Sequence, residues 1–137
     1  WVLTFSAFIF LSLALVKRYA ELIIQARAGY SDAHGRGYTL ADAPLLQTLG
    51  IAAGYLSILV LALYVRSESV TFLYSQPDLI WFAVPLLLFW VSWIWLIAHR
   101  GKMHDDPIIF AIQDKPSLLV ASLILSVFIL ASIGITI

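Results

Sequence analysis

The chain has 137 residues, of which 62% are hydrophobic and 12% are charged, and its mean hydropathy is +0.96. A soluble domain carries about a quarter charged residues, so this composition predicts a protein that is embedded in a lipid bilayer. The net charge is zero, which gives no indication of a nucleic-acid partner. The absence of cysteine excludes disulfides, thiolate catalysis and zinc–thiolate sites.

Four apolar segments are each close to the ~20 residues that a helix needs to cross the hydrocarbon core. They span residues 1–24, 44–65, 79–98 and 117–137. Only helices satisfy their own backbone hydrogen bonds in lipid over such lengths, so the sequence predicts an all-α, polytopic membrane bundle that forms a single domain. Trp1 opens inside an apolar run without a basic leader or a small-residue cleavage site. We therefore expect the C-terminal piece of a longer protein rather than a signal peptide.

The loops between these segments differ in charge. With four crossings, the first and third loops face the same side of the membrane. That side carries seven of the eight Lys and Arg residues, against Arg66 alone on the other side. This excess predicts that the first and third loops are cytoplasmic. The expected location is the inner (plasma) membrane, as a multi-pass protein.

The first predicted helix ends in a charged stretch, residues 17–22, with the sequence KRYAEL. Lys17 and Glu21 are four positions apart and share one face of a helix, with Arg18 about 100° away. One interpretation is an interfacial anchor, in which the cations snorkel to headgroups and Glu21 pairs with Lys17. The other is a site for a phosphorylated substrate, in which the cations hold phosphate oxygens and the carboxylate reaches a metal ion or a hydroxyl group.

A second candidate stretch is GRGYT, residues 35–39. Glycines on both sides of Arg36 let the backbone turn tightly or approach a ligand, and Arg36 and Tyr38 can then point at a phosphate or a sugar. The alternative is a flexible loop with an arginine that binds lipid headgroups. Asp42, a little further on, is predicted to be the N-cap of the second membrane helix.

The third stretch, residues 99–107, has the sequence HRGKMHDDP. Asp105 or Asp106 is predicted to cap a short helix with Pro107 in its first turn. The His and Asp side chains of this stretch match no firm pattern of metal ligands. Asp114 is predicted to cap the last helix, with Pro116 in its opening turn. The many aromatic residues of the third helix fit either helix packing or the wall of a groove for a lipid chain.

Taken together, KRYAEL at a helix end, RGYT in the next loop and the distal RGKMHDDPIIFAIQDK resemble the C-terminal half of the UbiA superfamily of intramembrane prenyltransferases. Within it, the likeness is to the polyprenyl-phosphate (decaprenyl-phosphate) phosphoribosyltransferases, and it spans residues 10–119. The resemblance implies a nine-helix bundle of which this chain forms the last four helices. It also implies Mg²⁺, bound chiefly by an Asn-Asp-x-x-Asp-x-x-x-Asp motif that is expected upstream and is absent here.

The second motif of that family is Asp-x-x-x-Asp in members that use prenyl diphosphates, and it falls where this chain has Lys17-x-x-x-Glu21. Lysine in place of aspartate exchanges a metal ligand for a direct phosphate contact. The resemblance therefore implies transfer of 5-phosphoribosyl from phosphoribosyl diphosphate to a polyprenyl phosphate, in the synthesis of cell-wall precursors. It implies that Glu21 is catalytic, and a candidate metal ligand. The implied substrate-binding residues are Lys17, Arg18, Arg36 and Tyr38.

Two alternatives stay open. The first keeps the fold but makes the protein a UbiA-type prenyltransferase that uses a prenyl diphosphate and an aromatic or other acceptor. The second is a non-enzymatic membrane module. The chain by itself is expected to be inactive, because the resemblance places half of the cavity wall upstream of it.

Overall fold

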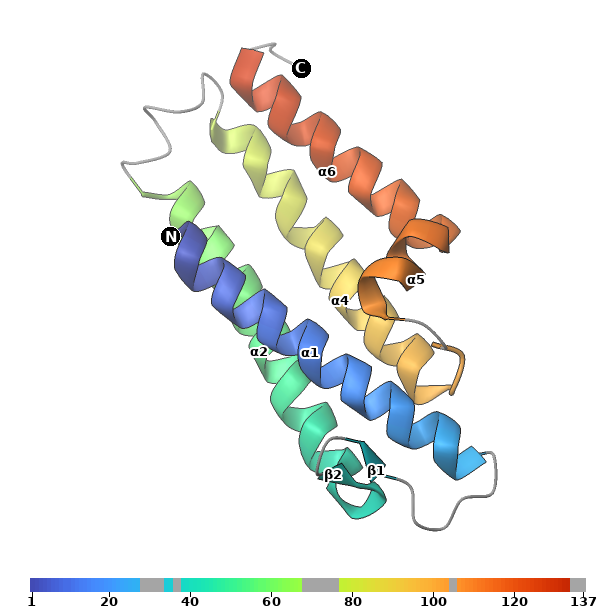
Figure 1. Cartoon of the computed structure of the whole chain (residues 1–137). Coiled ribbons are helices and arrows are strands. Elements are labelled where there is room, and N and C mark those ends of the chain that lie inside the picture. Colours follow the sequence, from blue (N-terminus) through green and yellow to red (C-terminus); the bar gives the residue numbers. More distant parts are fainter. Residues whose placement is uncertain (28–33, 36–37, 68–76, 104–105, 134–137) are drawn as a thin grey trace.

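The computed structural model describes residues 1–27, 34–35, 38–67, 77–103 and 106–133. Its four long helices lie side by side (Figure 1); they are α1 (Val2–Arg27), α2 (Ala43–Val65), α4 (Ala83–His99) and α6 (Lys115–Ile133). The shorter elements are the strands β1 (His34–Gly35) and β2 (Tyr38–Thr39), the 3₁₀ helices η1 (Leu40–Asp42) and η2 (Pro77–Phe82), and the helix α5 (Pro107–Gln113). The described chain is thus helical, as predicted, apart from one ladder of two-residue strands.

The helix boundaries differ from the predicted ones by a few residues. Helix α1 continues to Arg27, because Gln, Ala and Arg at its end all have high helix propensity. The third predicted segment begins as the 3₁₀ helix η2 and becomes α-helical only at Ala83. Pro85 explains this change, since proline is tolerated in the first turn of an α-helix but excludes an α-helical turn before it.

In the part of the chain that the structure describes, three helices are long and apolar enough to cross a membrane, namely Ala43–Val65, Asp78–His99 and Lys115–Ile133. Large apolar side chains also cover much of the outer surface, as at Leu125 of α6, which is 63% exposed. Soluble monomers rarely expose such large apolar areas, so this is a membrane protein. Helix α1 is not among the three candidate spans, and its apolar run stops at Lys17. The fourth crossing, the compartment and the loop orientation stay predictions.

Two glycines of α2 set the distance at which α1 and α4 pack against it. A Cβ atom at Gly50 would lie 2.0 Å from the Trp95 ring, and one at Gly54 would lie 2.7 Å from Val91 Cγ1 and 2.9 Å from Ser12 Oγ. The buried Ser12 hydroxyl donates to the Gly50 carbonyl at 2.7 Å and accepts from Trp95 Nε1 at 3.2 Å. Small residues that admit close backbone approach and a hydroxyl that bonds across helices are typical of membrane helix packing.

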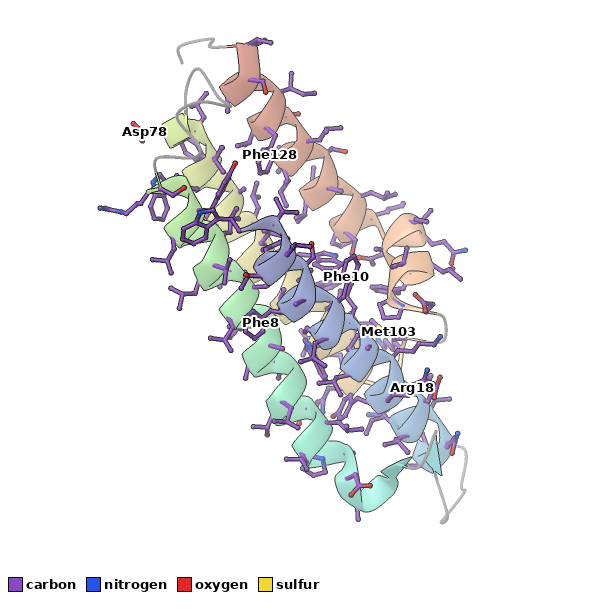
Figure 2. All side chains as sticks on the ribbon, turned by 60° about the vertical axis from the view of Figure 1, so that its left-hand side comes forward. Phe8, Phe10, Arg18, Asp78, Met103 and Phe128 are labelled. Carbon is purple, nitrogen blue, oxygen red and sulfur yellow. The ribbon has the colours of Figure 1, made fainter. Side chains whose placement is uncertain are left out.

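Consecutive long helices run in opposite directions (Figure 1), so the C-terminal ends of α1 and α4 lie at one end of the bundle with the N-terminal end of α2. Figure 2 shows Arg18 and Met103 toward this end and Asp78 toward the opposite one. We call it the basic end, because it gathers most of the described cations: Lys17, Arg18, Arg27, Arg100 and Lys102. Arg66 follows α2 at the other end, 5.8 Å from the centroid of the Trp81 ring.

The predicted helix caps are found at two of three positions. Asp106 caps α5, with Pro107 in its first turn, as predicted. Asp114 precedes α6, where its Oδ2 atom accepts from the Ser117 backbone N–H, the Ser117 hydroxyl and Trp93 Nε1 at 2.7 to 3.0 Å. Asp42 occupies the N-cap position of α2, but its side chain accepts no capping hydrogen bond, since its backbone is in the right-handed helical region instead of the extended one that a cap needs.

Candidate functional site

A pocket of about 260 Å³ lies at the basic end, between the last turns of α1 and the connection from α4 to α5. Lys17 and Glu21 both line it from α1, as their spacing predicts. Asp106 supplies a second carboxylate from the start of α5, and the buried Met103 gives the pocket an apolar floor. The remaining lining residues are Ala20, Ile24 and Gln25. Lysine and two carboxylates therefore share one cavity rather than facing outward separately.

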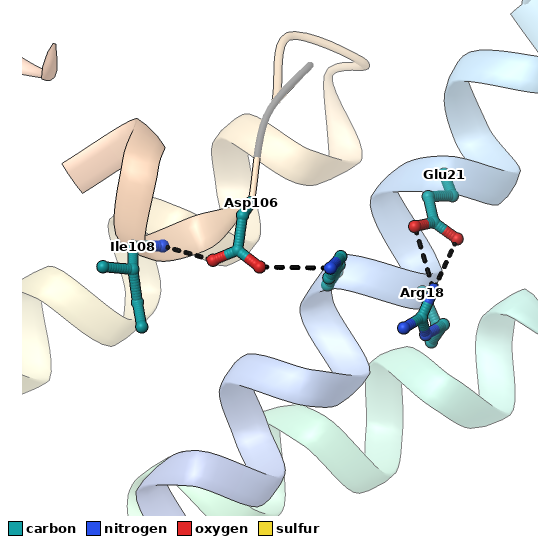
Figure 3. Close-up of polar contacts among 5 residues, drawn as sticks. Arg18, Glu21, Asp106 and Ile108 are labelled. Atoms are coloured by element: carbon teal, nitrogen blue, oxygen red, sulfur yellow. Dashed lines mark hydrogen bonds and ion pairs between the residues drawn. The ribbon is translucent and has the colours of Figure 1, made fainter. Parts of the chain in front are cut away.

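The ion pairs of this pocket differ from the predicted one. We expected Glu21 to pair with Lys17 if the stretch were an anchor. Instead Arg18 Nη1 donates to both Glu21 carboxylate oxygens at 3.0 Å, and Lys17 Nζ lies 3.2 Å from Asp106 Oδ2 (Figure 3). The predicted pairing was wrong because positions three apart on a helix are neighbours as well as positions four apart, and a partner from another element competes for the lysine.

Asp106 is held in place from two sides (Figure 3). Its Oδ1 atom accepts from the Ile108 backbone N–H at 3.0 Å, and its other oxygen faces Lys17. The Ile108 hydrogen bond and, after it, the Lys17 ammonium lower the pKa of the Asp106 carboxyl below its usual value, although partial burial opposes them. A lowered pKa means that these contacts stabilise the fold above the pKa of the unfolded chain. That contribution is lost as the pH falls through the lowered value.

Gly101 determines the backbone conformation of the loop between α4 and α5, which places Asp106 next to α1. Gly101 has a φ of +73°, and its N–H donates to the Ala98 carbonyl while that of Lys102 donates to the Ile97 carbonyl. This is the Schellman pattern that ends a helix with a left-handed glycine. A Cβ atom at Gly101 would also lie 2.7 Å from Arg27 Cδ. The loop after α4 therefore rests directly on the last residue of α1.

His99 contributes to packing in this structure. Its Nδ1 atom is 2.7 Å from the Tyr19 hydroxyl, and the two rings are stacked with an interplanar angle of 11°. Within the described ranges, no three His, Asp or Glu side chains gather closely enough to hold a metal ion. His104 and Asp105, the other members of the distal stretch, lie outside the described residues.

Two predicted substrate-binding residues are only partly covered by the structure. Arg36 lies outside the described residues. Tyr38 is described in its backbone alone, where it pairs with Gly35 in the antiparallel ladder of β1 and β2. Arg36 and Gly37, on which the predicted tight turn depends, lie outside the described residues. Whether the side chains of Arg36 and Tyr38 face the pocket stays a prediction.

An apolar groove of about 600 Å³ lies on the other side of α5, between α4, α5 and α6. Trp90 of α4, Ile108 and Ile112 of α5, and Phe128 of α6 are among the residues that line it. Other tryptophans of α4 serve packing, since Trp93 donates to Asp114 and Trp95 to Ser12. The aromatic helix thus packs against its neighbours and also lines the groove, and a lipid chain in that groove stays a prediction. Because α5 begins at the Asp106 cap and lines the groove, it joins the charged pocket to the apolar surface.

Reasoning from the sequence missed Asp106 and Met103 as pocket residues. Asp106 was predicted only as a helix cap, and no spacing rule connects it with Lys17, because the two lie on different elements. Met103 is the only methionine of the chain and stands in a polar stretch, yet it is 1% exposed. An apolar residue inside a charged loop was the available signal, since such a residue is often buried.

The fold and the pocket define a polytopic helical membrane protein with a charged pocket at one end. No family model matches the chain, and no solved structure matches it significantly. It is similar to the uncharacterized protein y4nM of Sinorhizobium fredii, with 39% identity over 132 residues, which are 96% of this chain and 26% of that protein. The nodulation protein NoeC of Azorhizobium caulinodans is 36% identical over 119 residues, 85% of this chain and 38% of that protein. The chain thus spans less than half of either relative.

Proposed function

We propose that the chain is part of an intramembrane transferase of the UbiA type, which moves 5-phosphoribosyl from phosphoribosyl diphosphate to a polyprenyl phosphate. The observation that supports this most is the pocket in which Lys17, Glu21 and Asp106 meet beside an apolar groove. A substrate with a phosphorylated, polar end and a lipid end needs both surfaces next to each other. An interfacial anchor needs neither a pocket nor a partner from a second element.

In the proposed reaction, the cations of α1 bind phosphate oxygens. Lys17 offers a compact ammonium on a flexible stem, and Arg18 a planar group with five N–H donors, of which the ion pair with Glu21 uses those on Nη1. A phosphate oxygen of the lipid attacks C1 of the ribose, and the bond from C1 to the diphosphate breaks. The diphosphate leaves with the bonding electrons, and no proton has to move because the attacking phosphate is already an anion. Glu21 orients a ribose hydroxyl.

The lipid side of the site follows from α5. Its N-terminal cap, Asp106, lines the pocket, while Ile108 and Ile112 line the groove. A polyprenyl phosphate whose chain lies in the groove can therefore reach the pocket with its phosphate around this short helix. Because the surrounding lipid is as apolar as the groove, van der Waals packing against these side chains, and not removal of apolar surface from water, would hold the tail there.

Mg²⁺ is implied by the resemblance, but the described residues offer few donors for it. The described residues offer two carboxylates in the pocket, each already paired with a cation. Mg²⁺ prefers six oxygen ligands in an octahedral arrangement, so these residues do not form a complete site. They could supply only part of the ligand set, and Glu21 is the ligand that the resemblance implies. The other ligands and the remaining helices of a nine-helix bundle belong to the proposal and would come from outside this chain.

Two alternatives differ in the donor that is consumed. A UbiA-type prenyltransferase would use a prenyl diphosphate and an aromatic or other acceptor, and a non-enzymatic membrane module would consume neither donor. We propose the phosphoribosyl reaction because lysine in the pocket, in place of a carboxylate, favours direct contact with the additional phosphate group of phosphoribosyl diphosphate.

The test is to supply membranes that express the complete gene with either labelled phosphoribosyl diphosphate or labelled farnesyl diphosphate, each together with polyprenyl phosphate and an aromatic acceptor. We expect label from the ribosyl donor in the lipid fraction and none from the prenyl donor. Membranes that express a Glu21→Ala variant serve as the control and should lose the lipid label. Label transferred only from the prenyl donor would establish the prenyltransferase instead, and transfer from neither donor would favour the non-enzymatic module.

A further inference from the structure

The pocket's cation, Lys17, and its neighbour on α1, Arg18, which does not line the pocket, are both paired with carboxylates that do. Lys17 is paired with Asp106, and Arg18 with Glu21. A phosphate that enters the pocket must therefore compete with carboxylates of the protein. The affinity of the pocket for an anion therefore depends on which of the two ion pairs separates when the anion binds.

We propose that Asp106 is the internal competitor: in the unliganded protein its carboxylate takes the place of a phosphate oxygen on Lys17, and so it sets the anion affinity of the pocket. This inference rests on the proposed function, since it concerns the same site. It assigns to Asp106 a role that differs from capping α5, because capping needs only an oxygen acceptor, whereas competition needs the negative charge.

The two ion pairs differ in how easily they separate. Arg18 and Glu21 belong to one helix, and two contacts of 3.0 Å join them. Lys17 and Asp106 come from different elements, meet through one contact of 3.2 Å, and are each about a third exposed. Solvent weakens such a partly exposed pair, and in the other pair Glu21 is as exposed but Arg18 is only 17% exposed. The Lys17–Asp106 pair is therefore the weaker of the two and opens first.

The surroundings of Asp106 also lower the free energy needed to separate it from Lys17. When Lys17 turns to a phosphate, Asp106 keeps the hydrogen bond from the Ile108 N–H. Its carboxylate is thus never left without a donor, which is the situation that costs most when an ion pair breaks. Lysine, with its four-carbon stem, is the mobile partner, while Asp106 stays fixed at the start of α5.

The experiment replaces the charge and keeps the cap. Asp106→Asn and Asp106→Ser both leave a good N-cap residue and remove the competing charge. Protein from the complete gene is held in detergent micelles, and its affinity for inorganic pyrophosphate is measured by calorimetry. We expect both variants to bind pyrophosphate up to about fivefold more tightly than the natural protein, the factor that corresponds to ~1 kcal/mol, the upper end for a partly exposed ion pair.

Asp114→Asn is the matched control. It also neutralises an aspartate that caps a helix, but Asp114 does not line the pocket, so the affinity should stay unchanged. Far-UV circular dichroism checks that each variant retains its helices. Equal or weaker binding by both Asp106 variants, while the natural protein binds pyrophosphate, would overturn the competition and leave the phosphate site standing. Absence of pyrophosphate binding from the natural protein and both variants would overturn the phosphate site and the competition together.

Discussion

Lys17→Ala is expected to lower kcat/KM for transfer from phosphoribosyl diphosphate by about 10²–10³-fold, the loss typical of removing one charged or polar donor from developing negative charge. The reason is that Lys17 is the only cation that lines the described pocket. The bundle should fold normally, because the lysine is exposed by about a third and bonds to one side chain alone. The measurement is labelled transfer by membranes that express the complete gene.

Lys102→Ala provides the control for this prediction. Lys102 carries the same charge at the same end of the bundle, but it is exposed and does not line the pocket. Its replacement should change kcat/KM by less than about twofold, since an exposed charge that does not line the pocket is largely screened by water and salt. If both lysine variants lost activity equally, the basic end would act through its overall charge, and the assigned contact to phosphate would be wrong.

Gly50→Ala is expected to destabilise the helix bundle by about 2–3 kcal/mol, at the upper end of what overpacking costs. The added Cβ would lie 2.0 Å from the Trp95 ring. That ring has little room to move, because Trp95 is 2% exposed, packs at 5.5 Å on the Tyr19 ring, and donates to Ser12. Unfolding in sodium dodecyl sulfate, followed by circular dichroism, measures the loss.

Two further variants decide whether this steric reason is right. Ala52→Val adds bulk to an exposed position of the same helix and should change the stability by less than about 0.5 kcal/mol. Trp95→Leu removes the atoms that the new Cβ would meet, so Gly50→Ala should cost much less in that background than in the natural protein. Equal costs in the two backgrounds would show that Gly50 and Trp95 are not in the contact described here.

Much of the fold could be predicted from the sequence, because membrane helices are set by local composition. Apolar segments of bilayer length placed α1, α2, α4 and α6, and proline after aspartate placed α5. The 3₁₀ start of the third segment and the packing of Gly50 against Trp95 could not be predicted in the same way. Both depend on contacts with residues of other elements, and the hydropathy of a segment does not show which elements will contact it.

The candidate site was predictable in one half only. The face shared by Lys17 and Glu21 follows from helical spacing, and the structure brings both to the pocket. The third charged residue, Asp106, is distant from Lys17 in the sequence. Its contact with Lys17 depends on how the loop after α4 packs against Arg27. The pairing of Arg18 with Glu21 shows the same limit, since spacing allows two partners and the tertiary contact of Lys17 selects between them.

The most direct test of the account is an experimental structure of the protein from the complete gene with phosphoribosyl diphosphate bound. The account predicts phosphate oxygens of the donor within hydrogen-bonding distance of Lys17 Nζ, and a separation of Lys17 from Asp106 relative to the present 3.2 Å. A donor bound elsewhere, with Lys17 still paired to Asp106, would contradict it.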